Sequence, residues 1–332
     1  MRKFFYFLMS VILLLTGCGA SKQMVVVAPK ATPAWYTNPP LSNERELYAI
    51  GDGKEKQEAI SNALTQLLST LSVSISSKYS AKSVVREGTY HSSSDATYIN
   101  ETQSEVKKIR VTNYELLQAK KLGFKHYAVL VKVDKEKFFD SLKKDLTQQF
   151  ALIAAEEKNI KAKNALQQLS FYKHSLAHLS DMQNRLAVMS VLKPDFDEHP
   201  FLKKYEYLKK RYNVLLHSIS FWVDAKYKAF IPVIAKGLTQ EQFIVAKTRS
   251  KNHFSVYIYA NIERAEAYGI MLARANITIK TKDAVGNEIA TNSINLTGRS
   301  SQSYAIAKQD LVKRLNRLVE REGIAKVLNL DI

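Results

Sequence analysis

Hydrophobic and polar residues follow two different periods along this chain. Residues 47–53 form a short apolar run that ends in glycines, which predicts a strand. The next apolar residues are spaced three and four apart, which predicts a helix with one buried face continuing into residues 69–83: Ile60, Ala63, Leu64, Leu67, Leu68, Leu71 and Ile75. After a polar loop at 88–97, two further strands are predicted at 110–117 and 124–133, with a turn at Gly123. The first folded region is therefore expected to be α+β, over residues 34–134.

The middle of the chain, residues 135–217, has the helical period throughout. No glycine or proline occurs between Phe124 and Lys193. A single helix over that span would be ~90 Å long at 1.5 Å per residue. A hairpin of two helices broken near Ser170 is favoured, because each apolar stripe then buries the other. A third helix at 200–217 is expected to complete a bundle.

The last region, residues 218–332, returns to alternation. A strand at 219–223, a helix at 230–238 and a short strand at 243–246 come first. Strict alternation then predicts three antiparallel strands with one solvated face, followed by a helix that ends at Gly323. The residues expected to point inward are Ile258, Ala260, Ile277 and Ile279, under Ala307, Leu311, Leu315 and Leu318 of the helix; those expected to point outward are Tyr257, Tyr259, Thr278 and Lys280.

The chain begins with the pattern of a lipoprotein signal peptide. Arg2 and Lys3 precede an apolar run too short to span a bilayer comfortably, and Leu15-Thr16-Gly17-Cys18 follows it. The pattern predicts cleavage between Gly17 and Cys18, removal of residues 1–17, and acyl (palmitate-type) lipid on Cys18. An ordinary secretory signal with a coincidental cysteine is the alternative, but Cys18 is the only cysteine. Residues 18–33 are then expected to be a lipidated tether.

Residues 33–145 carry short motifs in a recognisable order. Pro33-Ala34-Trp35 and Tyr48-Ala49-Ile50-Gly51-Asp52-Gly53 precede an alanine-rich helix, and Tyr127-Ala128-Val129-Leu130-Val131-Lys132-Val133-Asp134 follows it. This order resembles the LPP-twenty lipoprotein family of Helicobacter and Campylobacter relatives. The resemblance implies a periplasm-facing or surface-exposed outer-membrane lipoprotein without catalytic residues, and some relatives are tied to flagellum assembly. The chain departs from the small members by nearly 190 further residues, so their function need not transfer.

Composition narrows the choice of partners. The formal charge is +18, or +16 once Arg2 and Lys3 are removed with the signal. Such a charge usually indicates nucleic acid or anionic membrane, but a secreted chain does not meet nucleic acid. Lipopolysaccharide phosphates and peptidoglycan carboxylates are the available polyanions. A generally basic, lysine-rich proteome with no specific partner is the favoured explanation of the charge, because the cations are spread along the chain.

Candidate chemistry is sparse. His174 and His178 have the spacing of metal ligands on a helix, but no Glu or Cys accompanies them, so two exposed histidines are favoured. A crowded acidic turn, Asp195, Asp197 and Glu198, lacks the glycine of a calcium loop and suits helix capping. Gly51-Asp52-Gly53 lacks the rest of a nucleotide fingerprint and favours a plain turn. No catalytic residue, metal ligand or cofactor is predicted.

Three functions remain. The favoured one is a non-enzymatic envelope lipoprotein that serves as a scaffold or assembly factor, with Tyr257 and Tyr259 as the candidate contact surface for a protein partner. The second is a basic module that binds an anionic glycan or lipid. The third is a hydrolase with an unfamiliar site, which would require a pocket that joins a nucleophile to a histidine.

Overall fold

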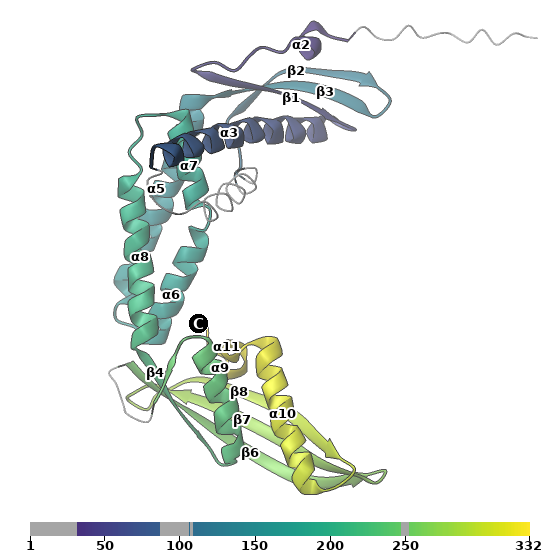
Figure 1. Ribbon diagram of the computed structural model, residues 1–332, viewed down its shortest axis with the longest axis vertical. Coiled ribbons are helices and arrows are strands. Elements are labelled where there is room, and N and C mark those ends of the chain that lie inside the picture. The colour runs from purple at the N-terminus through teal and green to yellow at the C-terminus, as the bar shows by residue number, and fades with distance from the viewer. Residues whose placement is uncertain (1–31, 87–105, 107–108, 247–251) are drawn as a thin grey trace, which may run out of the picture.

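The computed structural model describes residues 32–86, 106, 109–246 and 252–332. The fold is α+β, as predicted: a three-stranded sheet lies at one end, helices form a column, and a five-stranded sheet lies at the other end (Figure 1). The predicted signal peptide with Gly17 and Cys18, most of the tether, and the polar loop at 88–97 lie outside the described residues. Among the residues it does describe, no helix is both long and apolar enough to cross a bilayer.

The N-terminal sheet is antiparallel, in the order β1-β3-β2. Its strands are β1 (Glu46–Gly53), β2 (Tyr114–Gly123) and β3 (His126–Asp134), and its helices are α2 (Ala34–Thr37) and α3 (Lys56–Arg86). The long helix α3 packs on one face, while α2 lies on the other (Figure 1). The central strand β3 is consequently buried on both faces, since Ala128 and Leu130 are as buried as Val129 and Val131.

The position predicted for the second strand was wrong. It was placed at 110–117, but β2 begins at Tyr114 and continues to Gly123, and the hairpin turns at Phe124 and Lys125. Lys125 adopts a left-handed backbone with φ of 52°. The error has a physical cause: β2 is an edge strand with mostly exposed side chains, so its hydrophobic alternation is too weak to mark its ends.

The glycines at Gly51 and Gly53 do not form the turn predicted for them. Strand β1 runs through both, and α3 crosses directly above. A Cβ at Gly51 would overlap the carbonyl oxygen of Ala59 and the backbone nitrogen of Ala63. Glycine is therefore required here because a helix backbone approaches the strand closely.

The column contains four helices: the predicted hairpin with a break near Ser170 is wrong, and the further helix predicted at 200–217 is present. They are α5 (Lys135–Ile160), α6 (Ala165–His178), α7 (Met182–Leu192) and α8 (His199–Ser218). Ser170 lies in the middle of α6, and the chain breaks at 161–164 instead. There Asn164 Oδ1 accepts a hydrogen bond from Gln167 N at 2.9 Å and starts α6. The break is marked by a capping side chain and not by glycine or proline. A prediction based on those two residue types therefore misses it.

A polar cluster ties three helices of the column together. Glu157 Oε1 of α5 accepts hydrogen bonds from the hydroxyls of Tyr172 at 2.7 Å and Tyr207 at 2.6 Å, which belong to α6 and α8. Burial alone would raise the pKa of the Glu157 carboxyl, but the two tyrosines and the charges of Lys161 and Arg211 outweigh it and hold that pKa below 4.5. Burial in turn raises the pKa of Tyr172 to about 12.

The C-terminal sheet has the order β5-β4-β6-β7-β8. Its elements are β4 (Ile219–Ala225), the 3₁₀ turn η1 (Lys228–Phe230), α9 (Ile231–Gln240), β5 (Ile244–Val245), β6 (Asn252–Ala267), β7 (Ile270–Lys282), β8 (Glu288–Ser300), α10 (Tyr304–Glu322) and α11 (Ile324–Leu328). The antiparallel meander is confirmed for β6, β7 and β8. Strand β4 pairs parallel with both β5 and β6.

Helices α9 and α10 pack side by side on one face of this sheet (Figure 1). The inward positions follow the alternation: Ile258, Ile277 and Ile279 are fully buried, and Ala260 is half-buried. On α10 the buried stripe is Ala307, Leu311, Leu315 and Val319. Leu318, which was expected in that stripe, is only half-buried, because a spacing of four carries the stripe from Leu315 to Val319.

Candidate functional site

The outer face of the C-terminal sheet carries the two tyrosines singled out from the sequence. Tyr259 is 50% exposed, while Tyr257 is half-buried. The ring of Tyr257 meets Trp222 of β4 edge to face with centroids 5.7 Å apart, and Lys282 Nζ lies 5.8 Å from its centre. Alternation predicted the direction of both side chains but not the Trp222 contact, which depends on the parallel pairing of β4 with β6.

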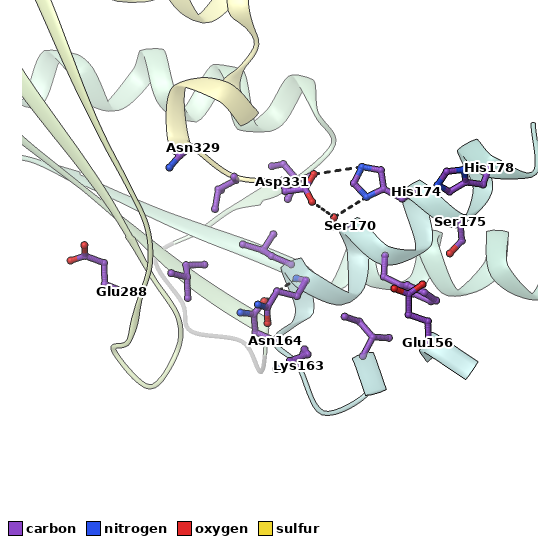
Figure 2. Close-up of a pocket in the computed structure, with 17 residues that line it drawn as sticks. Glu156, Lys163, Asn164, Ser170, His174, Ser175, His178, Glu288, Asn329 and Asp331 are labelled. Carbon is purple, nitrogen blue, oxygen red and sulfur yellow. Dashed lines mark hydrogen bonds and ion pairs between the residues drawn. The ribbon is translucent and has the colours of Figure 1, made fainter. Parts of the chain in front are cut away.

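A cavity of about 910 Å³ lies where the column meets the C-terminal segment 329–332. Its lining comes from α5, α6, the start of β8 and that segment, as Figure 2 shows. Ser170 Oγ donates a hydrogen bond to Asp331 Oδ2 at 2.6 Å, and His174 Nδ1 lies 3.3 Å from the same Oγ. This pocket joins a hydroxyl to a histidine, which is the arrangement that the hydrolase hypothesis requires.

The arrangement does not suit a nucleophilic serine. The hydroxyl proton of Ser170 is given to Asp331 rather than to the imidazole, so His174 is placed as a donor to Oγ and not as its base. His174 Nε2 lies 3.6 Å from Asp331 Oδ1, beyond a good hydrogen bond. Ser170 is also inside a regular helix, whose neighbouring N–H groups are bonded within it and cannot bind an oxyanion.

These contacts instead fasten the C-terminal segment to the column. Lys173 Nζ donates to the carbonyl oxygen of Ile332 at 2.7 Å, beside the Ser170–Asp331 bond. We call this set, Ser170, Lys173 and His174 with Asp331 and Ile332, the C-terminal latch. Its partners are about 160 residues apart in sequence, so spacing along the chain gives no sign of it.

The other candidates from the sequence are His178 and the acidic turn. His178 lies one turn beyond His174 on α6, and no interaction is drawn from its ring to the latch (Figure 2). Within the described parts of the chain, no group of three or more His, Cys, Asp or Glu is placed to hold a metal ion. In the acidic turn, Asp197 Oδ1 accepts from the N–H of His199, the first residue of α8, as a capping turn does.

Comparison with known families addresses the N-terminal region. Residues 33–134 match the LPP20 lipoprotein family. The match spans β1, α3, β2 and β3 and confirms the resemblance predicted from the short motifs. It supports a lipoprotein, and therefore attachment to a membrane through lipid.

Three solved structures are similar over parts of the chain. The secreted protein HP1454 from Helicobacter pylori is 13% identical, covers 83% of this chain and 98% of its own, and has a TM-score of 0.46. A minor lipoprotein from Acinetobacter baumannii is 13% identical over 33% of this chain and 94% of its own, with a TM-score of 0.29. Lipoprotein GNA1162 from Neisseria meningitidis is 11% identical over 31% of this chain and 99% of its own, with a TM-score of 0.21. No curated protein matches the chain.

Proposed function

We propose that this protein is a non-enzymatic lipoprotein of the outer membrane, anchored through Cys18 and facing the periplasm, that serves as a rigid spacer in assembling the cell envelope. In this proposal residues 34–134 lie nearest the anchor, residues 135–217 set a distance, and residues 218–332 present a contact surface. A link to flagellum assembly rests on the family resemblance alone.

The observation that carries the proposal is the absence of linkers at the two ends of the column. Strand β3 passes into α5 at Asp134, whose side chain accepts from Lys137 N at 3.0 Å and caps that helix. Helix α8 passes into β4 between Ser218 and Ile219. The 20 residues of α8 span about 30 Å at 1.5 Å per residue, so both sheets are held at a defined separation.

A continuous apolar core also supports a fixed separation between the two sheets. Buried side chains connect without a break from Leu47 in the first sheet, through Phe150 and Leu186 in the column, to Leu328 at the far end. Interfaces between loosely joined domains are usually smaller and more polar. The contact surface proposed for a protein partner is the outer sheet face around Tyr257 and Tyr259, because aromatic side chains are enriched at protein interfaces.

The first experiment tests the anchor. Cys18→Ser should release the protein from the outer-membrane fraction, because acyl chains contribute ~0.8 kcal/mol per buried CH₂. The wild type should stay in the pellet after a high-salt wash. A Cys18→Ser protein that also stays there would show that lipidation is not the anchor.

The second experiment tests the spacer. A Gly/Ser insertion between Ser218 and Ile219 should preserve membrane attachment but change the proteins captured by crosslinking in native membranes. The same insertion at Val285, which is exposed in the turn between β7 and β8, is the matched control. Identical crosslinks from both insertions would contradict a spacing role.

Binding of an anionic glycan or lipid is the second candidate, favoured by the net charge of +16 that remains once Arg2 and Lys3 are removed and by a groove that gathers four arginines. A steep fall of binding to lipopolysaccharide or peptidoglycan with salt would support it.

A further inference from the structure

A groove of about 340 Å³ runs between the edge strand β8 and helix α10, and four arginines line it. Arg314, Arg317 and Arg321 lie on one face of α10, at spacings of three and four, and Arg299 comes from the end of β8. The rest of the lining is Asn295, Leu296 and Thr297 of β8 with Leu318 of α10. We call this the arginine groove.

Two carboxylates neutralise only part of this charge. Asp310 Oδ2 accepts from Arg314 Nε at 2.7 Å, and Asp310 Oδ1 lies 3.6 Å from an Arg317 nitrogen. Glu322 pairs with Arg321 at 2.8 Å and with Lys326 at 3.2 Å. Five cations therefore face two carboxylates, and Arg317 and Arg321 keep most of their side chains exposed. The groove retains positive charge and guanidinium donors for another anion.

The neighbouring edge of β8 has backbone groups turned outward. In an antiparallel pair, alternate residues direct both N–H and C=O away from the partner strand. Arg299 N bonds to Asp310 Oδ2 at 2.9 Å instead of to β7, Ser293 N bonds to Asn292 Oδ1, and Thr291 O accepts from Asn329. These three bonds identify the odd-numbered positions as the outward ones.

Asn295 and Thr297 belong to the same outward series and lie beside the arginines. The same alternation turns the backbone N–H and C=O of both residues away from β7, and within the described residues no other element bonds to these groups. Over its 13 residues β8 contains no proline and no lysine, and its only charges are Glu288 and Arg299 near its ends. Natural edge strands are normally protected by such residues, so the part of this edge at Asn295 and Thr297 is open to a further strand.

We propose that an extended acidic segment of a partner protein adds to β8 as a further strand, with its amides paired to Asn295 and Thr297 and its carboxylates bound by Arg314, Arg317 and Arg321. The free edge groups require a peptide, and the arginine forks suit carboxylates. The inference rests on the proposed scaffold role, for which it names the chemical class of a partner.

A second copy of this chain does not fit the groove. Pairing β8 with β8 would bring the same four arginines of each copy together, and like charges at an interface cost affinity. A single free anion would occupy the guanidinium groups but leave the outward groups of Asn295 and Thr297 unused. Both occupants are distinguished by the experiment.

The binding test uses the full-length protein in neutral detergent and a labelled short peptide of alternating Glu and Val, measured by fluorescence anisotropy. The Glu–Val peptide should bind at least about tenfold more tightly than the matched Gln–Val peptide, since hydrogen bonds between charged groups are the strong ones. Arg317→Gln with Arg321→Gln should weaken binding by at least about tenfold and lower its salt dependence.

The matched control variant is Lys308→Gln with Lys209→Gln, which loses the same charge on the opposite side of α10 and on exposed α8. This variant should bind like the wild type. Methylating the peptide nitrogens that face β8 should abolish binding, whereas methylating the alternate nitrogens should not.

The inference is overturned if both charge variants weaken binding equally, if the two methylated peptides behave alike, or if inorganic phosphate competes as well as the Glu–Val peptide. Concentration-dependent self-association that Asn295→Pro removes, without peptide binding, would identify a second copy as the occupant and overturn it as well. Peptide binding in detergent does not depend on the anchor or the column length. If the peptide does not bind, the spacer proposal therefore still stands. If the Cys18→Ser or insertion test fails, the peptide-binding result can still be interpreted.

Discussion

The two sheets of this protein solve the same packing problem and differ in what they leave uncovered. Each receives a helix at a strand glycine: α3 crosses β1 at Gly51, and α10 crosses β8 at Gly298, where a Cβ would overlap Ala307 O. In the N-terminal sheet the opposite face of β3 is also buried, with Leu130 only 4% exposed. In the C-terminal sheet the opposite face keeps Tyr259 half exposed.

Under the proposed function, this difference is the reason for assigning the contact surface to the C-terminal sheet. The central strand β3 of the N-terminal sheet is buried on both faces and offers no solvated face. A sheet with one solvated face and an open edge keeps aromatic side chains, arginines and backbone groups available. The column of helices holds this second sheet away from the first.

The largest expected effect on stability comes from placing a charge on the face opposite α3 in the first sheet and on the face opposite α10 in the second. Leu130→Asp should bury an unpaired carboxylate and cost several kcal/mol, enough to unfold the region. Thr278→Asp, on the outer face of the other sheet, should change stability by about 0.5 kcal/mol at most. Ile277→Asp, on the covered face, should behave like Leu130→Asp. Chemical denaturation monitored by circular dichroism measures all three. Equal costs for Leu130→Asp and Thr278→Asp would remove the contrast between the sheets.

Both sheets have a helix that approaches a strand closely at a glycine, and replacing that glycine with alanine tests this feature. Gly51→Ala and Gly298→Ala should each destabilise the protein by about 1–3 kcal/mol or more, because the helix must move to admit a methyl group. Gly123→Ala is the control: its nearest neighbour would be 3.8 Å away, and its cost should stay within about 0.5 kcal/mol. Thermal unfolding compares the three variants. A neutral Gly298→Ala would mean that α10 is held less tightly than α3.

The polar cluster around Glu157 should make the stability of the protein depend on pH in the acid range. The pKa of Glu157 is lower in the folded state, so its contribution is present above the ordinary pKa of 4.5 and is lost as pH falls through the folded value. Glu157→Gln should cost about 1–3 kcal/mol at pH 7 and flatten stability below pH 4.5. Exposed Glu156→Gln is the neighbouring control. If both variants keep the wild-type acid slope, Glu157 does not join the helices in the way described.

The smallest effect on stability is expected at the tyrosines of the outer face. Tyr259→Ser should stay within about 0.5 kcal/mol. Tyr257→Ser should cost about 1 kcal/mol, because it also loses the ring contact with Trp222. A partner that uses this face should nevertheless lose crosslinking with the double variant while the melting curve moves little. Collapse of the C-terminal region would instead show that the outer face is covered.

Much of this architecture could be predicted from the chain alone. Period-two alternation placed Ile258, Ile277 and Ile279 inward, since a strand turns successive side chains to opposite faces. The helical period located α3, α8 and α10. Local patterns fail where the signal is weak, as at the exposed edge strand β2, or where one side chain decides, as at the Asn164 cap.

The features that bear on function depended on tertiary structure. Ser170 joins Asp331 across about 160 residues, and Arg299 meets Arg317 only because α10 returns along β8. Arg314, Arg317 and Arg321 are spaced three and four apart in the sequence, but their gathering with Arg299 was missed, because the cations are spread along the chain. The sequence determined the buried face of the helix α3 and of the strands β6 and β7, because burial there follows the period of the backbone. The tertiary structure decided which elements are neighbours, because those contacts join residues whose separation along the chain carries no periodic signal.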